Sequence, residues 1–174
     1  MLETPDEITR LQALLEASHA SASGHLRGII GDDRTLTARD IVAAMTGMKV
    51  LAVATVTARG EPRISALDGH FLHATWTFST DATAAKARHL RARPQASVAH
   101  IDHEELAVFA HGRVEEIGEA DPDRTATIEH WTAHYGSSPL SWGTEIRLYR
   151  LRPQWMVGYA ADRARLRARL GRTR

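Results

Sequence analysis

The chain has 174 residues, 43% of them hydrophobic, which predicts one folded domain with its own core and excludes the disordered and fibrous classes. Lys and Arg total 22 against 21 Asp and Glu, and this net charge of +1 gives no global argument for nucleic acid or an anionic membrane, so we expect neither partner. The lack of cysteine excludes disulfide and thiol chemistry, and without a signal-like or bilayer-length apolar segment we expect a cytoplasmic protein.

Residues 1–46 are predicted to form a helical extension. Pro5-Asp6-Glu7 places proline and acidic residues in a first helical turn, and an apolar stripe follows at Ile8, Leu11, Leu14 and Leu15. A second helix is expected after Thr37, because Thr37-Ala38-Arg39-Asp40 has the form of a capping box with Asp in place of Glu. The stripe predicts that this extension docks onto the rest of the chain or onto a partner.

Residues 47–160 read as antiparallel strands interrupted by a short helix. Val50 to Thr57 is a nearly continuous β-branched and apolar run, and Gly60 and Pro62 mark the turn that follows. Strands are expected at 63–72 and 76–80, joined by a hairpin. Helix formers then extend from 81 to 91 and stop before Pro94, and 95–101 and 106–117 read as another antiparallel pair.

The remainder predicts one more helix, one more strand and a basic end. Asp121-Pro122-Asp123 is expected to cap a helix that carries Ile128, Trp131 and Tyr135. A late strand is predicted at 147–155. Residues 161–174 are rich in arginine and predict a solvated basic helix or tail.

Several short motifs follow one another in a defined order between residues 41 and 159. They are Thr55-Val56-Thr57 with residues 60–65, Phe78-Ser79-Thr80 with Lys86 to Leu90 and Pro94, Val108 to Glu115 around Gly112, and the strand 147–155. This order resembles the FMN-binding split-barrel family, the pyridoxamine-5'-phosphate-oxidase-like proteins that include the deazaflavin-dependent oxidoreductases.

The resemblance implies both architecture and function. The expected fold is mainly β, a six-stranded antiparallel split barrel at residues 47–160 with peripheral helices, preceded by the extension 1–46 and followed by the tail 161–174. The family forms homodimers with two cofactor sites at the subunit interface. The expected function is that of an oxidoreductase in which reduced FMN, or the deazaflavin coenzyme F-420, delivers hydride to a small conjugated substrate.

A flavin phosphate would need cationic and hydrogen-bonding groups, and the chain offers them around residue 80. Ser79, Thr80 and Asp81 lead from a strand into a helix N-terminus, where free backbone N–H groups and the helix dipole favour an anion, and Lys86 lies one turn inside. We therefore expect Ser79, Thr80 and Lys86 to hold the phosphate. Weaker candidates are Arg88 and His89. The competing interpretation is an ordinary helix cap with a solvated basic face.

The remaining cofactor contacts follow from the resemblance. Arg63 and Ser65 share one face of their strand and match the positions at which the family approaches the flavin pyrimidine edge and ribityl chain. Arginine there would stabilise the anionic reduced ring. Trp155 is expected to contact the cofactor across the subunit interface. The sequence shows no dedicated catalytic acid or base.

The 10 histidines raise other interpretations. His100 and Asp102 share a strand face, His103 lies in the adjoining turn, and His111 could supply a third ligand across the hairpin. These residues lack a recognised metal spacing, so we expect no metal site. Haem stays open, because some relatives bind it and one axial histidine is enough. The alternative function is therefore a non-catalytic module that stores or senses flavin or haem.

Overall fold

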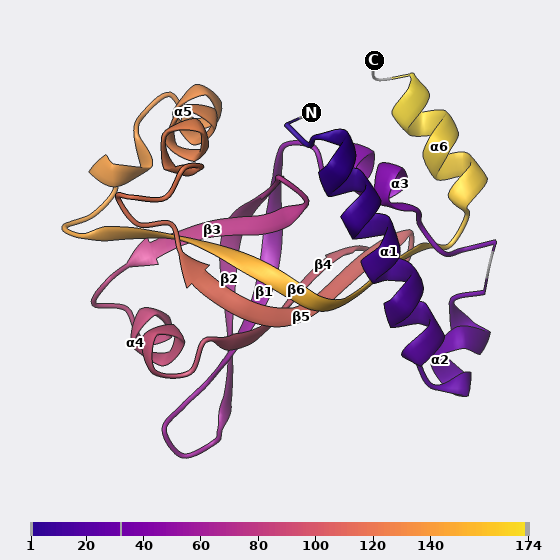
Figure 1. Cartoon of the computed structure of the whole chain (residues 1–174), viewed down its shortest axis with the longest axis horizontal. Coiled ribbons are helices and arrows are strands. Elements are labelled where there is room, and N and C mark those ends of the chain that lie inside the picture. Colours follow the sequence, from indigo (N-terminus) through magenta and orange to yellow (C-terminus); the bar gives the residue numbers. More distant parts are fainter. Residues whose placement is uncertain (1, 32, 173–174) are drawn as a thin grey trace.

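The computed structural model describes residues 2–31 and 33–172. Within them, six antiparallel strands close into one barrel in the order β1-β2-β3-β6-β5-β4 (Figure 1). The strands are β1 (Met48–Val56), β2 (Pro62–Leu72), β3 (Thr75–Asp81), β4 (Gln95–Asp102), β5 (Leu106–Glu116) and β6 (Ile146–Ala160). The predicted fold, a six-stranded antiparallel barrel with peripheral helices, is confirmed.

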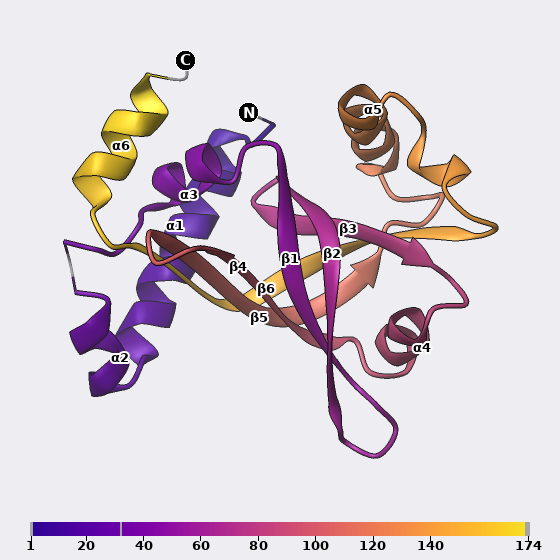
Figure 2. The ribbon, with the colours of Figure 1, turned by 180° about the vertical axis from the view of Figure 1, so that it is seen from behind.

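Helices occupy the two ends of the barrel. Four of them, α1 (Pro5–Ser21), α2 (Gly24–Ile29), α3 (Ala38–Ala44) and α6 (Arg163–Gly171), gather at one end (Figure 1). The other end carries α4 (Ala85–Ala92). Helix α5 (Arg124–Tyr135) and the 3-10 turn η1 (Pro139–Ser141) lie outside the barrel, where Trp131 of α5 packs with Leu72 of β2 and Leu148 of β6. None of the described helices lies in front of β1 and β2 when the barrel is seen from behind (Figure 2).

Alternation along the strands builds the core. On β1, Leu51, Val53 and Thr55 are buried, whereas the residues between them point outward. Gly69 on β2 is required by this interior, because a Cβ there would lie 2.2 Å from Cδ1 of Leu51. The barrel interior is therefore closely packed at its middle, and space for a ligand is found outside it or at its ends.

The N-terminal extension packs onto the barrel, and its predicted capping box is present. Leu11 and Leu15 join the same apolar cluster as the barrel interior. The Oγ of Ser18 accepts a hydrogen bond from the backbone N–H of Met156 on β6 at 2.9 Å. The capping box of Thr37 and Asp40 opens α3 as the sequence predicts.

The basic C-terminal segment forms α6 and is tied to α3. Arg167 donates to both carboxylate oxygens of Asp40, at 2.7 and 2.8 Å. Burial by itself would raise the pKa of Asp40, but the hydrogen bonds from Arg167 and Thr37 outweigh it and lower that pKa. Leu166 is buried beneath the helix. One face of α6 is thus docked, and the other carries exposed arginines.

Some predicted boundaries are shifted. The helix expected from residue 81 begins at Ala85, because the carboxylate of Asp81 accepts hydrogen bonds from the N–H and hydroxyl of Thr83 and holds a turn there. Asp123 is the N-cap residue of α5 but its side chain does not cap the helix. The last strand continues to Ala160, five residues beyond the predicted end.

Candidate functional site

The N-terminus of α4 is open to an anion. Its N-cap residue is Ala84, which has no side chain that could accept a hydrogen bond, so the first backbone N–H groups of the helix have no side-chain cap. The ammonium group of Lys86 forms no ion pair or hydrogen bond with any residue that the structure describes. Arg88 instead donates to the backbone carbonyl of Thr83 at 2.5 Å and closes the turn before the helix.

One flank of α4 rests on β1. The Nδ1 of His89 lies 3.0 Å from the hydroxyl of Thr55, which is only 1% exposed. Arg63 on β2 is paired directly with Thr55 in the β1–β2 register, so the two side chains share a face of the sheet. Arg63 is exposed and forms an ion pair with Glu61 at 2.8 Å. This register brings the strand of Arg63 and Ser65 next to the helix that carries Lys86.

The two predicted hydroxyl ligands face opposite sides of β3. Ser79 pairs with Leu148, which belongs to a small apolar cluster with Trp131 of α5. Thr80 is 9% exposed and, because side chains alternate along a strand, points to the other face. Thr80 is therefore the hydroxyl of this pair that faces away from α5.

Trp155 lies far from these groups within one chain. On β6 it is eight residues from Arg147, the partner of Thr80, a separation of about 26 Å at about 3.3 Å per residue. Its ring stacks on His111 of β5 at a centroid distance of 4.9 Å. A single chain does not bring Trp155 to the α4 end of the barrel.

The outer surface of the barrel carries a largely apolar face, interrupted by Ser97 and bordered by Asp68, which we call the outer face. Its most exposed large residues are Val50 on β1, Ile64 on β2 and Ile101 on β4, at 58%, 75% and 58% exposure. Small residues fill the surface between them. They are Ala52, Ala54, Ala66 and Ala99. Stacked His111 and Trp155 continue this face onto β5 and β6.

Sequence reasoning missed a hydrogen-bonded chain that joins α5 to β2. The hydroxyl of Tyr135 donates to Asp68 at 3.3 Å and lies 3.3 Å from Nε2 of His70, and Nδ1 of His70 lies 3.1 Å from Nε2 of His130. Because Tyr135 donates to the carboxylate, its oxygen accepts from His70 Nε2–H, and His70 Nδ1 accepts from His130. Every donor in this series of hydrogen bonds therefore points toward Asp68.

Burial shifts the pKa values of His70 and Tyr135 in this hydrogen-bonded series. Burial first, and then the charges of His130, His134 and Lys49, lower the pKa of His70 to about 4, so this histidine is neutral near pH 7. Burial and the neighbouring Asp68 raise the pKa of Tyr135 to about 12. The helical spacing of His130, His134 and Tyr135 was the available indication that these side chains share one side of α5.

The histidines considered for a metal do not converge. His100 is paired with Val108, a core residue, whereas His111 is paired with Ser97 on the outer face. The two imidazoles therefore lie on opposite faces of the β4–β5 pair. Among residues 2–31 and 33–172, no group of three or more His, Cys, Asp or Glu side chains could hold a metal ion.

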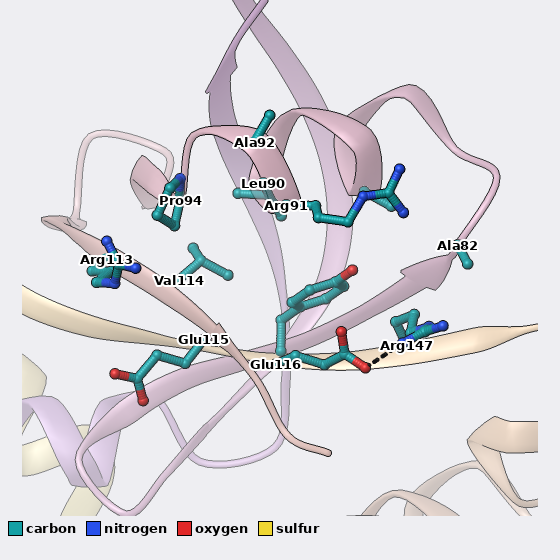
Figure 3. A pocket seen from close by; sticks show the side chains of 12 residues that line it. Ala82, Leu90, Arg91, Ala92, Pro94, Arg113, Val114, Glu115, Glu116 and Arg147 are labelled. Carbon is teal, nitrogen blue, oxygen red and sulfur yellow. Dashed lines mark hydrogen bonds and ion pairs between the residues drawn. The ribbon is translucent and has the colours of Figure 1, made fainter.

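A groove of about 450 Å³ separates α4 from the paired strands β5 and β6. Figure 3 shows Arg91 and Arg113 on opposite sides of this groove, and Glu116 bonded to Arg147 near its base. Neither Lys86 nor His89 lines it. The groove is thus separate from the flank of α4 that contacts β1.

Comparison with known proteins identifies the family. Residues 38–157 match the family model described as pyridoxamine 5'-phosphate oxidase. No curated protein matches the sequence. None of the described helices is both long enough and apolar enough to cross a membrane.

Solved structures share the fold at low identity. A protein of unknown function from Agrobacterium tumefaciens is 22% identical with a TM-score of 0.59, over 68% of this chain and 53% of that one, so the chain spans about half of its length. The haem storage protein HutZ of Vibrio cholerae is 22% identical with a TM-score of 0.56, over 64% of this chain and 86% of that one.

An F420 reductase is 21% identical with a TM-score of 0.50, over 62% of this chain and 88% of that chain. These likenesses establish the shared fold, and the family model covers well over half of the sequence. The chain belongs to the pyridoxamine 5'-phosphate oxidase-like family of FMN-binding split barrels.

Proposed function

We propose that the protein is an oxidoreductase that uses FMN, or alternatively the deazaflavin F-420, and acts on a small conjugated substrate. The proposal is supported by α4, which has an uncapped N-terminus and carries Lys86, whose ammonium is unpaired within the described structure. His89 of the same helix contacts Thr55 on β1, and Thr55 is the register partner of Arg63 on β2. Such a combination of backbone donors and cations suits a phosphate monoester. A family neighbour described as an F420 reductase agrees with it.

The residues present fit a ribityl phosphate better than they fit an ordinary helix cap. The carboxylate of Asp81, the nearest to the helix start, is already bonded to Thr83. The backbone carbonyl of Asp81 accepts from the N–H of Ala84, so the N–H groups from Ala85 onward are the ones that no side chain caps. Lys86 would hold the phosphate together with these backbone groups, and Thr80 would contribute its hydroxyl. Ser79, facing α5, would take part only through its backbone.

When bound, the flavin ring supplies hydride transfer. Arg63 is the permanently charged group on the adjoining strand and would stabilise the negative charge of the reduced ring. It is now paired with Glu61, so ring binding would require it to exchange that exposed partner, which costs little at 56% side-chain exposure. Ser65, two residues along on the same face, would follow the ribityl chain.

We further propose that the active form is a homodimer built on the outer face. An exposed apolar surface of this kind is unusual on a monomer, and its small side chains allow a second copy to approach closely. A partner subunit would also explain how Trp155 could reach a cofactor, since it lies about 26 Å from the α4 end within its own chain. Trp155 would then contact the cofactor of the other subunit.

A non-catalytic haem-binding module is the second candidate, and one observation favours it. His111 is exposed, its Nδ1 is held by the hydroxyl of Ser97 at 2.8 Å, and its ring is stacked on Trp155. An oriented imidazole with a free Nε2 is what an axial haem ligand needs. The haem storage protein among the structural neighbours agrees with this alternative.

The absorption spectrum of the purified protein separates the candidates. Flavin gives bands at about 370 and 450 nm, whereas a haem Soret band or oxidised deazaflavin absorbs at about 400 to 420 nm, and the spectrum after reduction distinguishes these two. Titration with FMN should show tight binding that Lys86→Ala weakens about tenfold or more, because a charge-assisted contact is worth about 1.5 to 3 kcal/mol. Arg93→Ala, an exposed change after the same helix, is the control. Equal FMN affinity in both variants would exclude this phosphate site.

A further inference from the structure

The groove between α4 and the β5–β6 pair has no role in the proposed cofactor site. It is lined from one side by Ala87, Leu90 and Arg91 of α4, and from the other by strand residues that include Arg113 and Tyr149. Its volume of about 450 Å³ lies within the range of small-molecule sites. Helix α4 stands between this groove and the Thr55 side of the barrel.

Two arginine side chains that line the groove have no carboxylate partner among the described residues. Glu116 is bonded to Arg147 at 2.7 Å, and Glu115 is bonded to Arg152 at 3.0 Å, so both lining carboxylates already have cationic partners. Within the part of the chain that the structure describes, Arg91 and Arg113 form no ion pair and no side-chain hydrogen bond. The groove therefore presents two uncompensated guanidinium groups to any ligand.

These two groups approach from different elements. Arg91 projects from α4 and Arg113 from β5, and they lie on opposite sides of the opening in Figure 3. Guanidinium groups bind carboxylate and phosphate through paired hydrogen bonds. A ligand lying between them would therefore meet a cation at each side, an arrangement that suits an anionic group better than a neutral one.

The wall between the arginines is apolar and aromatic. Tyr149 stacks on Phe78, with centroids 5.8 Å apart and an interplanar angle of 27°, so its ring is held in one orientation by the core. Leu90, Val114 and Pro94 extend this wall. A fixed aromatic surface favours a flat, conjugated ligand, which can stack on the ring or contact its edge.

We propose that this groove is a second ligand site, which binds a small planar aromatic anion bearing a carboxylate or a phosphate. Arg91 and Arg113, one on each side of the groove, attract the anion electrostatically, and the wall formed by Tyr149 and its apolar neighbours receives the ring. The site works alongside the proposed flavin site and does not depend on it, because none of its lining residues is Lys86, His89, Arg63 or Thr80.

Calorimetric titration with 4-nitrophenyl phosphate, a flat aromatic phosphate, tests the proposal. The measurement is made on the full chain without FMN and again with saturating FMN. We expect binding in both states, with Arg91→Gln and Arg113→Gln each weakening it at least tenfold and Arg93→Gln leaving it unchanged. Circular dichroism verifies that all three variants fold.

Two further probes test the chemistry of the ligand. Inorganic phosphate, which lacks the ring, and 4-nitrobenzyl alcohol, which lacks the charge, should each bind at least tenfold more weakly than 4-nitrophenyl phosphate. Wild-type affinity in both Arg91→Gln and Arg113→Gln, or no binding by the wild type at millimolar probe, would overturn the proposal. One-for-one displacement by FMN would overturn it as well, by making the groove part of the cofactor site. A protein that binds the probe but not FMN would instead refute the flavin proposal alone.

Discussion

The hydroxyl of Thr55 on β1 lies 3.0 Å from Nδ1 of His89 on α4, and this contact fixes the helix that carries Lys86 against the barrel. Thr55 is also the register partner of Arg63, so one buried threonine links the helix to the strand expected to approach the flavin. The orientation of the candidate phosphate site therefore depends on this polar contact together with the buried Ala87 and Leu90 of the same helix.

Replacing Thr55 by valine should disturb this site with little change in volume. The variant leaves Nδ1 of His89 without its partner, and we expect a loss of about 1 kcal/mol in the free energy of unfolding together with weaker FMN retention. Urea denaturation and FMN titration measure the two effects. In the double variant Thr55→Val, His89→Ala, the losses should be clearly less than additive. Additive losses would show that the two residues act independently.

Ile64→Lys should convert a dimer into a monomer. Ile64 is 75% exposed on the outer face, so a lysine there costs the folded chain little but places a charge in the proposed subunit interface. Light scattering at low micromolar concentration should give a dimer for the wild type and a monomer for the variant. Ile29→Lys, on α2 and 44% exposed, should remain dimeric. A monomeric wild type would refute the proposed assembly.

Stability should fall in mild acid because of His70. Its pKa is lowered to about 4 in the folded state by burial first and then by His130, His134 and Lys49, whereas the unfolded value is near 6.5. Between these values the unfolded chain binds more protons, so the free energy of unfolding decreases as the pH falls from about 6.5 to about 4, by up to about 3 kcal/mol.

Denaturation at several pH values checks this prediction. His70→Gln, which cannot titrate, should flatten the pH profile over that window, although it also changes the baseline stability through lost contacts with Tyr135 and His130. His103→Gln, whose side chain is 91% exposed, should keep the wild-type profile. An unchanged slope in His70→Gln would show that other groups carry the pH dependence.

Arg150→Met should destabilise the protein strongly. The side chain of Arg150 is 7% exposed and pairs with Asp121 and with Asp123, so it anchors the segment before α5 to β6. Removing the cation leaves carboxylates without their partner, and we expect a loss of about 3 to 5 kcal/mol. Arg147→Met, at an exposed pair with Glu116, should cost far less, because water screens that pair. Urea denaturation compares the two, and equal losses would contradict this account.

The sequence by itself determined the elements and much of their order. The β-branched run from Val50, the turn at Gly60 and Pro62 and the capping box at Thr37 each specify local backbone geometry, and each is present in the structure. The motif order also identified the family, because the spacing of strands and of the short basic helix persists when overall identity is low. Lys86 was placed near a helix N-terminus by the same local reasoning.

Only the tertiary structure decided which side chains meet. Ser79 and Thr80 are adjacent in sequence, yet strand pairing with Leu148 and Arg147 turns them to opposite faces. His70 and His130 are 60 residues apart, and α5 must dock on β2 before they form a hydrogen bond. Local patterns specify backbone conformation and periodicity, whereas strand register, barrel closure and helix docking depend on contacts between distant segments that no short stretch of sequence contains.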